Sequence, residues 1–252
     1  MSEAIEQTGA RYPLLAKRTS KRWLITAAVT TSIVALPVLS VLILALFPEE
    51  NIWPHLLDTT LPRYLVTTLQ LMAGVAFITL VIGLASAWAV TMCDFPGRKF
   101  FEWAMLLPFA VPAYVIAYVY TSLLDYAGPV QTAMRDWFGW HNAADYWFPE
   151  IRSLEGATLM IGLVLYPYVY LLARAAFLEQ SPSLFAVSRS LGHSAISTFF
   201  RVVLPIARPA VAVGLSLVLM ETLNDFGTVD FFAVQTLTAG LFDTWMNLGN
   251  LG

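Results

Sequence analysis

The sequence has few charged residues and almost no cysteine. Only 12% of its 252 residues are Asp, Glu, Lys or Arg, whereas soluble domains carry about 25%. Cys93 is the single cysteine, which excludes an internal disulfide and a cysteine-rich metal site. A Walker A loop and the HExxH, GxSxG and CxxC patterns are also missing, so the common signatures of hydrolytic and redox enzymes are absent. These absences predict a membrane protein that is not an enzyme.

The chain instead has long apolar segments. Hydrophobic residues make up 58% of it, and the mean hydropathy is +0.68. Because a helix needs about 20 apolar residues to cross a bilayer, the sequence predicts an all-α polytopic fold. We expect a tail at 1–22 and a transmembrane domain over 23–252, with spans at about 23–47, 64–92, 103–124, 157–177 and 204–223. The first apolar run is too long for a cleavable signal, so it is predicted to be an uncleaved anchor.

The distribution of basic residues predicts the orientation. All Lys and Arg except Arg63, Arg135 and Arg152 lie on the same side as the N-terminal tail. Because basic residues in short loops mark the cytoplasmic side, the N-terminus is predicted to be cytoplasmic. The opposite loops carry tryptophans, among them Trp137 and Trp147, which predict an aromatic belt at the outer interface.

The segment 181–201, between the fourth and fifth spans, has a helical apolar pattern. Three apolar residues recur at i, i+3 and i+7, as on one helix face: Leu184, Val187 and Leu191. Gly192 then ends the pattern, and a second short apolar group follows. Two interpretations fit: an amphipathic helix on the membrane surface, or a helix that inserts its apolar face into a groove on a partner protein.

This segment resembles the signature loop by which the permease subunits of binding-protein-dependent ABC importers dock on their ATPase. The usual loop is Glu-Ala-Ala, three residues, Gly, nine residues, Ile, one residue, Leu-Pro. Gly192, Val202, Leu204 and Pro205 match in register, whereas 186–188 reads Ala-Val-Ser instead of Glu-Ala-Ala. The resemblance implies an ATPase-docking site made of Ala186, Val187, Ser188, Arg189, Leu191, Gly192, Leu204 and Pro205.

Two longer stretches, Leu106–Gln131 and Met220–Phe242, resemble the N-terminal half of the ferric-iron permeases of this family. The resemblance implies a type I importer bundle in the bacterial cytoplasmic membrane that moves ferric iron inward and has no cofactor of its own. It also implies separate ABC ATPase subunits, an extracytoplasmic substrate-binding protein and a second permease half. On the same grounds we expect a further span after the fifth, and hence that the chain is part of a longer gene product.

Two alternatives remain open. A related permease for a polyamine, thiamine or sulfate would keep the docking loop. A passive channel or a structural membrane subunit would not need that loop, and copurification with an ATPase separates the two classes. Nucleic-acid binding is not expected, because no basic patch follows the N-terminal tail.

The end of the fifth span concentrates polar residues, which are costly at membrane depth and commonly functional. On one continuous helix, four of them would share a face at i, i+3, i+4 and i+7: Glu221, Asn224, Asp225 and Thr228. Such oxygen ligands suit a hard cation, although they could equally cap the helix end or lie at the outer surface. No tight metal site is expected, because a binding protein usually holds and selects the substrate in this family.

Tyrosines and prolines mark the third and fourth spans as candidates for lining a pathway. Tyr114 and Tyr118 are four residues apart, as are Tyr166 and Tyr170, so each pair shares a helix face whose hydroxyls need partners. Prolines interrupt both spans and indicate either simple kinks or helices that line a pathway: Pro108, Pro112 and Pro167. The predicted substrate pathway therefore also includes Tyr114 and Tyr118.

Overall fold

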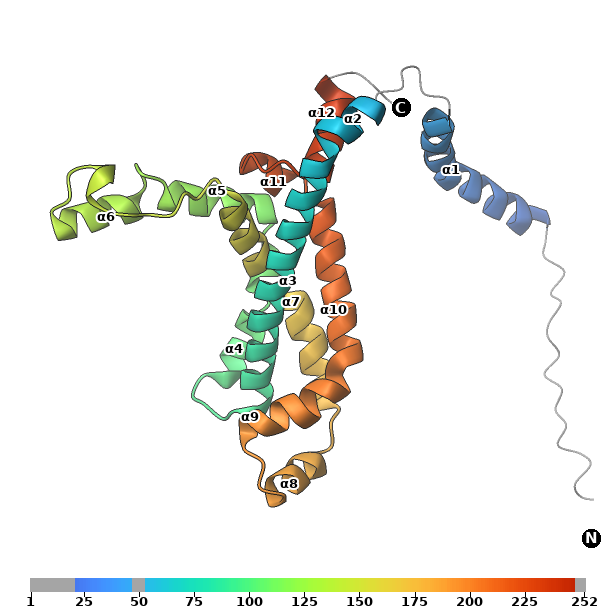
Figure 1. Ribbon diagram of the computed structural model, residues 1–252. Helices are drawn as coiled ribbons and strands as arrows, with labels where there is room; N and C mark the ends of the chain where they lie inside the picture. The colour runs from blue at the N-terminus through green and yellow to red at the C-terminus, as the bar shows by residue number, and fades with distance from the viewer. Residues whose placement is uncertain (1–20, 47–52, 248–252) are drawn as a thin grey trace, which may run out of the picture. The chain divides into compact units, whose positions relative to one another are not determined.

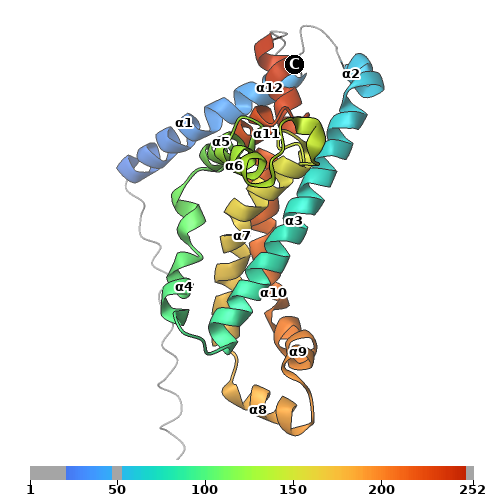
Figure 2. The same cartoon turned by 90° about the vertical axis from the view of Figure 1, so that its left-hand side faces the viewer.

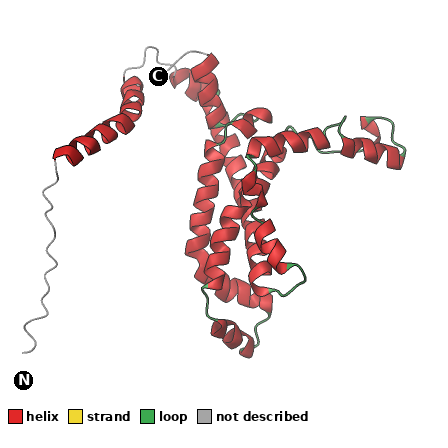
Figure 3. Cartoon of the chain, turned by 180° about the vertical axis from the view of Figure 1, so that it is seen from behind, coloured by secondary structure: helices red, strands yellow, loops and turns green. Residues whose placement is uncertain are grey.

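The computed structural model describes residues 21–46 and 53–247, which form helices and connecting loops without a strand (Figure 3). The predicted all-α fold is confirmed. Within these ranges four helices are long and apolar enough to cross a membrane, or five if one bent pair is counted as a single span. The first helix belongs to one compact unit and the remaining helices to another, so each unit is described by itself.

Helix α1 (Lys21–Leu46) is the described part of the first unit. It covers nearly all of the predicted first span, and large apolar side chains along it are exposed, among them Trp23, Ile33, Leu39 and Leu46. Pro37 lies inside it without ending it. An exposed apolar helix of 26 residues has the length and surface that a bilayer core accommodates. Most of the predicted tail, 1–22, lies outside the described residues.

The second unit is built around three long helices, α3 (Leu61–Met92), α7 (Leu154–Leu178) and α10 (Leu204–Asn224), which lie side by side (Figures 1 and 2). Helix α7 is central, because its most apolar stretch is 67% buried, against 22% for α3 and 28% for the span that contains α10. The core joins residues of all three helices, among them Leu71, Val75, Ile161, Val169 and Val218. The outward faces of α3 and α10 are therefore available to lipid or to other subunits.

Glycines bring α3 and α7 close together. A Cβ on Gly83 of α3 would lie 2.8 Å from Cβ of Val169, and a Cβ on Gly162 of α7 would lie 2.7 Å from Cγ2 of Ile78. Each helix thus presents a glycine to a branched side chain of the other, the small-residue packing that membrane helices use. Any larger residue at Gly83 or Gly162 would force the helices apart.

The predicted third span, 103–124, is not one continuous helix. The chain forms α4 (Arg98–Ala104), the 3-10 turn η1 (Leu107–Ala110) and α5 (Ala113–Leu124), and its direction changes by 96° between 98–110 and 113–138. Pro112 has no N–H for a helical hydrogen bond, and it restricts Val111 to an extended backbone with φ −126° and ψ 126°. The proline therefore separates two helices instead of bending one.

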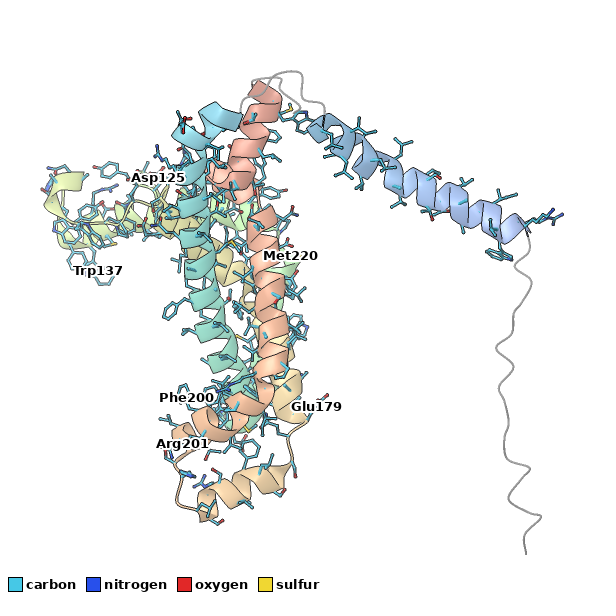
Figure 4. The ribbon with its side chains drawn as sticks, turned by 45° about the vertical axis from the view of Figure 1, so that its right-hand side comes forward. Asp125, Trp137, Glu179, Phe200, Arg201 and Met220 are labelled. Atoms are coloured by element: carbon cyan, nitrogen blue, oxygen red, sulfur yellow. The ribbon has the colours of Figure 1, made fainter. Side chains whose placement is uncertain are left out.

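After this break the chain forms an arm, residues 113–153, that projects sideways from the three long helices (Figure 1). It contains α5, α6 (Pro129–Phe138) and the 3-10 turn η2 (Ala143–Asp145), with Trp137 near its far end (Figure 4). Hydrogen bonds fix its fold: Arg135 donates to the Tyr146 hydroxyl (2.9 Å), and that hydroxyl donates to Oε1 of Gln131 (2.6 Å). Trp137 and Trp147 remain 87% and 85% exposed, and their place in an interfacial belt stays a prediction.

The remaining short helices gather at the two ends of the second unit (Figure 2). At one end lie α8 (Pro182–Ser190), α9 (Ala195–Thr198) and the single π-helical turn η3 (Phe199–Val203), which continues into α10. At the other end lie α2 (Trp53–Thr59), α11 (Gly227–Phe231) and α12 (Leu237–Asn247). Helix α12 packs against α3, where the Leu237 N–H donates to Oγ1 of Thr68 (2.9 Å).

Candidate functional site

The segment 181–201 forms two short helices, α8 and α9, on either side of Gly192. Each begins at a serine whose hydroxyl accepts a backbone N–H of the first turn, Ser181 for α8 and Ser194 for α9, as N-cap residues do. Figure 2 shows both helices beyond the ends of α7 and α10. The sequence pattern therefore predicted the helices and the turn between them correctly.

Gly192 is required for its backbone conformation and not for space. Its φ is +83°, whereas nothing lies within 4 Å of the position that a Cβ would take. The His193 N–H donates to the Ser188 carbonyl (3.2 Å), and the Gly192 N–H donates to the Arg189 carbonyl (2.9 Å). This pair of bonds is the Schellman pattern, which ends a helix at a left-handed residue, usually glycine.

The predicted docking residues separate into an exposed set and an internal set. Ser188 is buried, and Leu204 and Pro205 are half-buried at the start of α10. The other five are exposed on α8 and its C-terminal turn: Ala186, Val187, Arg189, Leu191 and Gly192. The exposed set is therefore the most accessible part of the predicted docking site, and Ser188 is its one fully internal member.

An apolar face runs along the segment. Leu184, Val187 and Leu191 are 39%, 57% and 72% exposed, and beyond the turn Ile196 and Phe200 are 72% and 62% exposed. Figure 4 shows Phe200 and Arg201 where the segment joins α10. A group of exposed apolar side chains on a segment outside the long helices is a candidate interaction site.

The interior of the segment is tied together by two hydroxyl groups. Oγ of Ser188 lies 2.8 Å from Oγ1 of Thr198, and both residues are buried. Ser188 occupies the last position of the Ala-Val-Ser triplet that replaces Glu-Ala-Ala. Its hydroxyl therefore has a structural partner, which the sequence alone did not indicate.

The segment is also fastened to the long helices. Phe199 packs edge-on against Trp88 of α3, with ring centroids 4.8 Å apart, and lies 6.1 Å from Phe177 of α7. At the end of α7, Nε2 of the buried Gln180 donates to the Val203 carbonyl (3.0 Å). Sequence reasoning missed Trp88 and Gln180. For Gln180 the only signal in the sequence was a glutamine close after a long apolar helix.

At the opposite end of α10, the predicted single polar face is wrong. Helix α10 ends at Asn224, Asp225 adopts an extended ψ of 116°, and Thr228 belongs to a separate helix, α11. Oδ1 of Asp225 accepts the Thr228 N–H (2.8 Å), a local bond that competes with continued helix. Glu221 and Asn224 are exposed on α10, Asp225 is half-buried and Thr228 is fully buried.

The two tyrosines predicted to line the pathway lie beside this corner. Tyr114 and Tyr118 are 56% and 61% exposed on α5, which packs against α11. With Val115, Gly227 and Phe231 they line an apolar hollow of about 260 Å³. Tyr118 and Phe231 are in ring contact, with centroids 6.0 Å apart. The structure thus brings Tyr114, Tyr118 and the Asp225–Thr228 turn to neighbouring positions.

The second tyrosine pair, Tyr166 and Tyr170, is buried, and both hydroxyls have the partners that the sequence analysis expected. The Tyr170 hydroxyl donates to the Glu102 carbonyl (2.8 Å), and the Tyr166 hydroxyl lies 3.5 Å from Sδ of Met105. One turn further along α7, Arg174 forms an ion pair with the Glu102 carboxylate. These contacts hold the interrupted third segment against α7. Among the described residues, no group of three or more His, Cys, Asp or Glu could hold a metal ion.

Comparison with known families decides the class. Residues 79–243, which include α7, the segment 181–201, α10 and α11, match the family described as "Binding-protein-dependent transport system inner membrane component". The chain belongs to this family. The permease is a multi-pass inner-membrane transport subunit of an ABC transporter, and the ATPase is a separate subunit.

Curated relatives of the permease carry different substrates in their names. It is 26% identical over 165 residues to the molybdenum transport permease ModB of Escherichia coli, covering 66% of this chain and 69% of ModB. It is 28% identical over 181 residues to the Fe(3+)-transport permease FbpB 2 of Haemophilus influenzae, covering 72% of this chain but 31% of that protein. It is 29% identical over 153 residues to the sulfate permease CysT of Salmonella typhimurium, covering 61% and 52%.

A solved structure shares the fold of the permease. The chain of a bacterial alginate ABC transporter, crystallised with an alginate-bound periplasmic protein, superimposes with a TM-score of 0.70 over 93% of this chain and 87% of that chain. The two are 16% identical. This likeness confirms the type I importer permease architecture predicted from the signature loop.

Proposed function

We propose that this permease imports a small solute, ferric iron in the first instance, with its N-terminus and the α8–α9 segment on the cytoplasmic side. Partner ATPase subunits drive the transport, an extracytoplasmic binding protein delivers the substrate, and a second permease half completes the pathway. The observation that carries the proposal is the helix–Gly192–helix segment with its exposed apolar face. A passive channel has no use for such a segment.

Docking on the ATPase uses the exposed set of α8 residues. Val187 and Leu191 present exposed apolar side chains on a short helix that the buried Ser188–Thr198 contact holds to α9. A rigid apolar helix face of this kind fits a groove on a partner, with Arg189 available for a charged contact at the rim. Because Ala186 replaces the usual glutamate, the apolar contacts carry more of the binding here.

Ferric iron is supported by the chemistry at the other end of α10. Glu221 and Asp230 are exposed and Asp225 is half-buried, so three carboxylates lie within ten residues of sequence. Carboxylate oxygens attract a hard trivalent cation and repel an oxyanion. The likeness to FbpB 2 points the same way. The likeness to ModB and CysT makes an oxyanion, molybdate or sulfate, the second candidate.

The test is uptake in the native host, so that every partner subunit is present. Cells with the gene deleted, restored, or carrying Gly192→Val would be given radiolabelled ferric iron, molybdate and sulfate in separate assays. The proposal expects the deletion and Gly192→Val to lower iron uptake and leave the two oxyanions unchanged. Loss of molybdate or sulfate uptake instead would replace iron by that ion. Uptake that survives Gly192→Val but not the deletion would reject the docking role.

A further inference from the structure

Gln180 occupies an unusual position at the end of α7. Its side chain is 9% exposed, and Nε2 donates to the Val203 carbonyl at 3.0 Å, across 23 residues of sequence. Val203 itself is fully buried. The bond therefore joins the second residue after α7 to the residue that precedes α10, and the whole docking segment lies between the two.

The backbone at Val203 is irregular. Residues 199–203 form a π-helical turn, in which the Leu204 N–H donates to the Phe199 carbonyl, five residues back. Pro205 follows and has no N–H to donate. Such wide turns are frequent at functional sites in helices, and they are among the places where helices kink.

We propose that Gln180 is a positioning residue for energy coupling: its amide fastens the start of α10 to the end of α7, so that displacement of the docking segment moves both helices together. The inference rests on the docking role proposed above. Within the segment, the Ser188–Thr198 bond joins α8 to α9, and the Phe177–Phe199 contact supports the same junction. Gln180 adds the only described side-chain hydrogen bond between residues 179–181 and η3.

A variant can remove the bond without a large effect on folding. Oε1 of Gln180 is buried without a hydrogen-bond partner, so the native side chain already carries an unsatisfied acceptor. Gln180→Met keeps the length and approximate volume, removes the donor, and removes that orphan acceptor as well. Because the two changes oppose each other in stability, the variant is expected to fold and to assemble. Glu179→Gln, at the adjacent exposed position, is the matched control.

The first experiment measures coupling in the complete transporter, purified from its host through a tag on this chain and placed in proteoliposomes. The probe is radiolabelled ferric iron, molybdate or sulfate, whichever ion the unaltered transporter accumulates. Gln180→Met is expected to retain the copurified ATPase and its basal ATP hydrolysis. The number of ions moved per ATP should fall about fivefold, which is the change in an equilibrium constant that the loss of one typical hydrogen bond causes. Glu179→Gln should match the unaltered transporter.

An unchanged ratio of ions moved to ATP hydrolysed in Gln180→Met would overturn the inference. If the ATPase does not copurify even with the unaltered chain, the docking proposal fails first, and that result is distinguishable because it does not depend on position 180. A rise in basal ATP hydrolysis without transport would support the inference, since it means that the motor works while its movement is not passed on.

A second measurement tests the structural step directly. In a Cys93→Ser background, spin labels at the exposed positions Leu178 and Ile206 report the distance between the end of α7 and the start of α10. The inference expects one narrow distance distribution in the parent and a broader one in Gln180→Met. Equal widths would show that the amide does not hold the junction, and would reject the inference even if transport fell.

Discussion

The hydroxyl groups of Ser188 and Thr198 lie 2.8 Å apart in the buried interior of the α8–α9 segment. They join α8 to α9 across the Gly192 turn, so that the two short helices form one body. The hydroxyl of Ser188 therefore makes a hydrogen bond between the two helices that the methyl group of an alanine could not make. In this permease the departure from the usual Glu-Ala-Ala triplet is matched by a partner ten residues away.

Ser188→Ala should loosen the segment. It leaves the Thr198 hydroxyl buried without its partner, which costs about 1–3 kcal/mol locally. We expect faster amide hydrogen exchange in residues 186–198 and reduced uptake. Thr198→Val added to Ser188→Ala should restore part of the loss, because no orphan hydroxyl then remains. Ser190→Ala is the control, since Ser190 is exposed and bonds only within its own helix; equal effects of Ser188→Ala and Ser190→Ala would contradict the role of the buried pair.

Gly192→Val should impair coupling through backbone strain alone. A left-handed conformation costs an ordinary L-residue about 1–2 kcal/mol, while no neighbouring atom obstructs a side chain. Gly192→Asn should retain more uptake, because Asn tolerates this conformation better. Gly139→Val provides a matched control: Gly139 has φ +70° and open space, but lies in the arm. If Gly139→Val lowers uptake as much as Gly192→Val does, backbone strain at any position would be enough to impair uptake, and the result would not support a special role for Gly192.

Asp225 can be tested for charge against capping. Asp225→Asn keeps an oxygen that accepts the Thr228 N–H, whereas Asp225→Ala loses the cap at a cost of about 1 kcal/mol. If the carboxylate attracts a cation, both variants and Glu221→Gln should lower iron uptake without affecting membrane insertion. If Asp225→Asn is fully active while Asp225→Ala is impaired, the role of Asp225 is structural and its charge is not needed. Labelling of a cysteine at 221 from the lipid phase would place that position outside the pathway.

The Asp145 turn should respond to acid. Asp145 accepts the backbone N–H groups of His141 (2.7 Å) and Asn142 (3.0 Å), and these bonds lower its carboxyl pKa below the ordinary 3.8. A carboxyl with a lowered folded pKa stabilises the fold above its ordinary value and loses that contribution as the pH falls through the folded value. The protection of the His141 and Asn142 amides, measured relative to the intrinsic exchange rate at each pH, should therefore persist down to about pH 4 and fall below it. Asp145→Asn should remove this pH dependence; a dependence that persists would assign it to another group.

Local signals in the sequence were sufficient for most of the fold. Apolar length predicted α1, α3, α7 and α10, and Gly192 with its flanking apolar residues predicted α8 and α9. The third predicted span is not one continuous helix, because two prolines within five residues, Pro108 and Pro112, separate helices that an apolar count joins. The bent pair can still count as one broken span. The prediction that Thr228 shares a helix face with Glu221 was wrong because Asp225 accepts the Thr228 N–H where α10 ends. A count of helical positions cannot show this.

The contacts that hold the site together could not be predicted from the sequence. Gln180 and Val203 are 23 residues apart, and Trp88 meets Phe199 from a different helix. Neither pairing has a local pattern, because both depend on how α3, α7 and α10 lie against one another. Ser188 illustrates the same limit: helical spacing puts it on α8, but only its burial against α9 shows that it faces inward.

The reciprocal glycine packing of α3 and α7 restricts where this permease can change shape. With Gly83 against Val169 and Gly162 against Ile78, neither helix can slide past the other without collision of branched side chains with backbone. Conformational change next to this pair is then left to the interruption at Val111–Pro112 before the arm, because the π turn before α10 is fastened to the end of α7 by Gln180. Helices α3 and α7 would therefore move as one rigid pair, and Val111–Pro112 would act as the hinge.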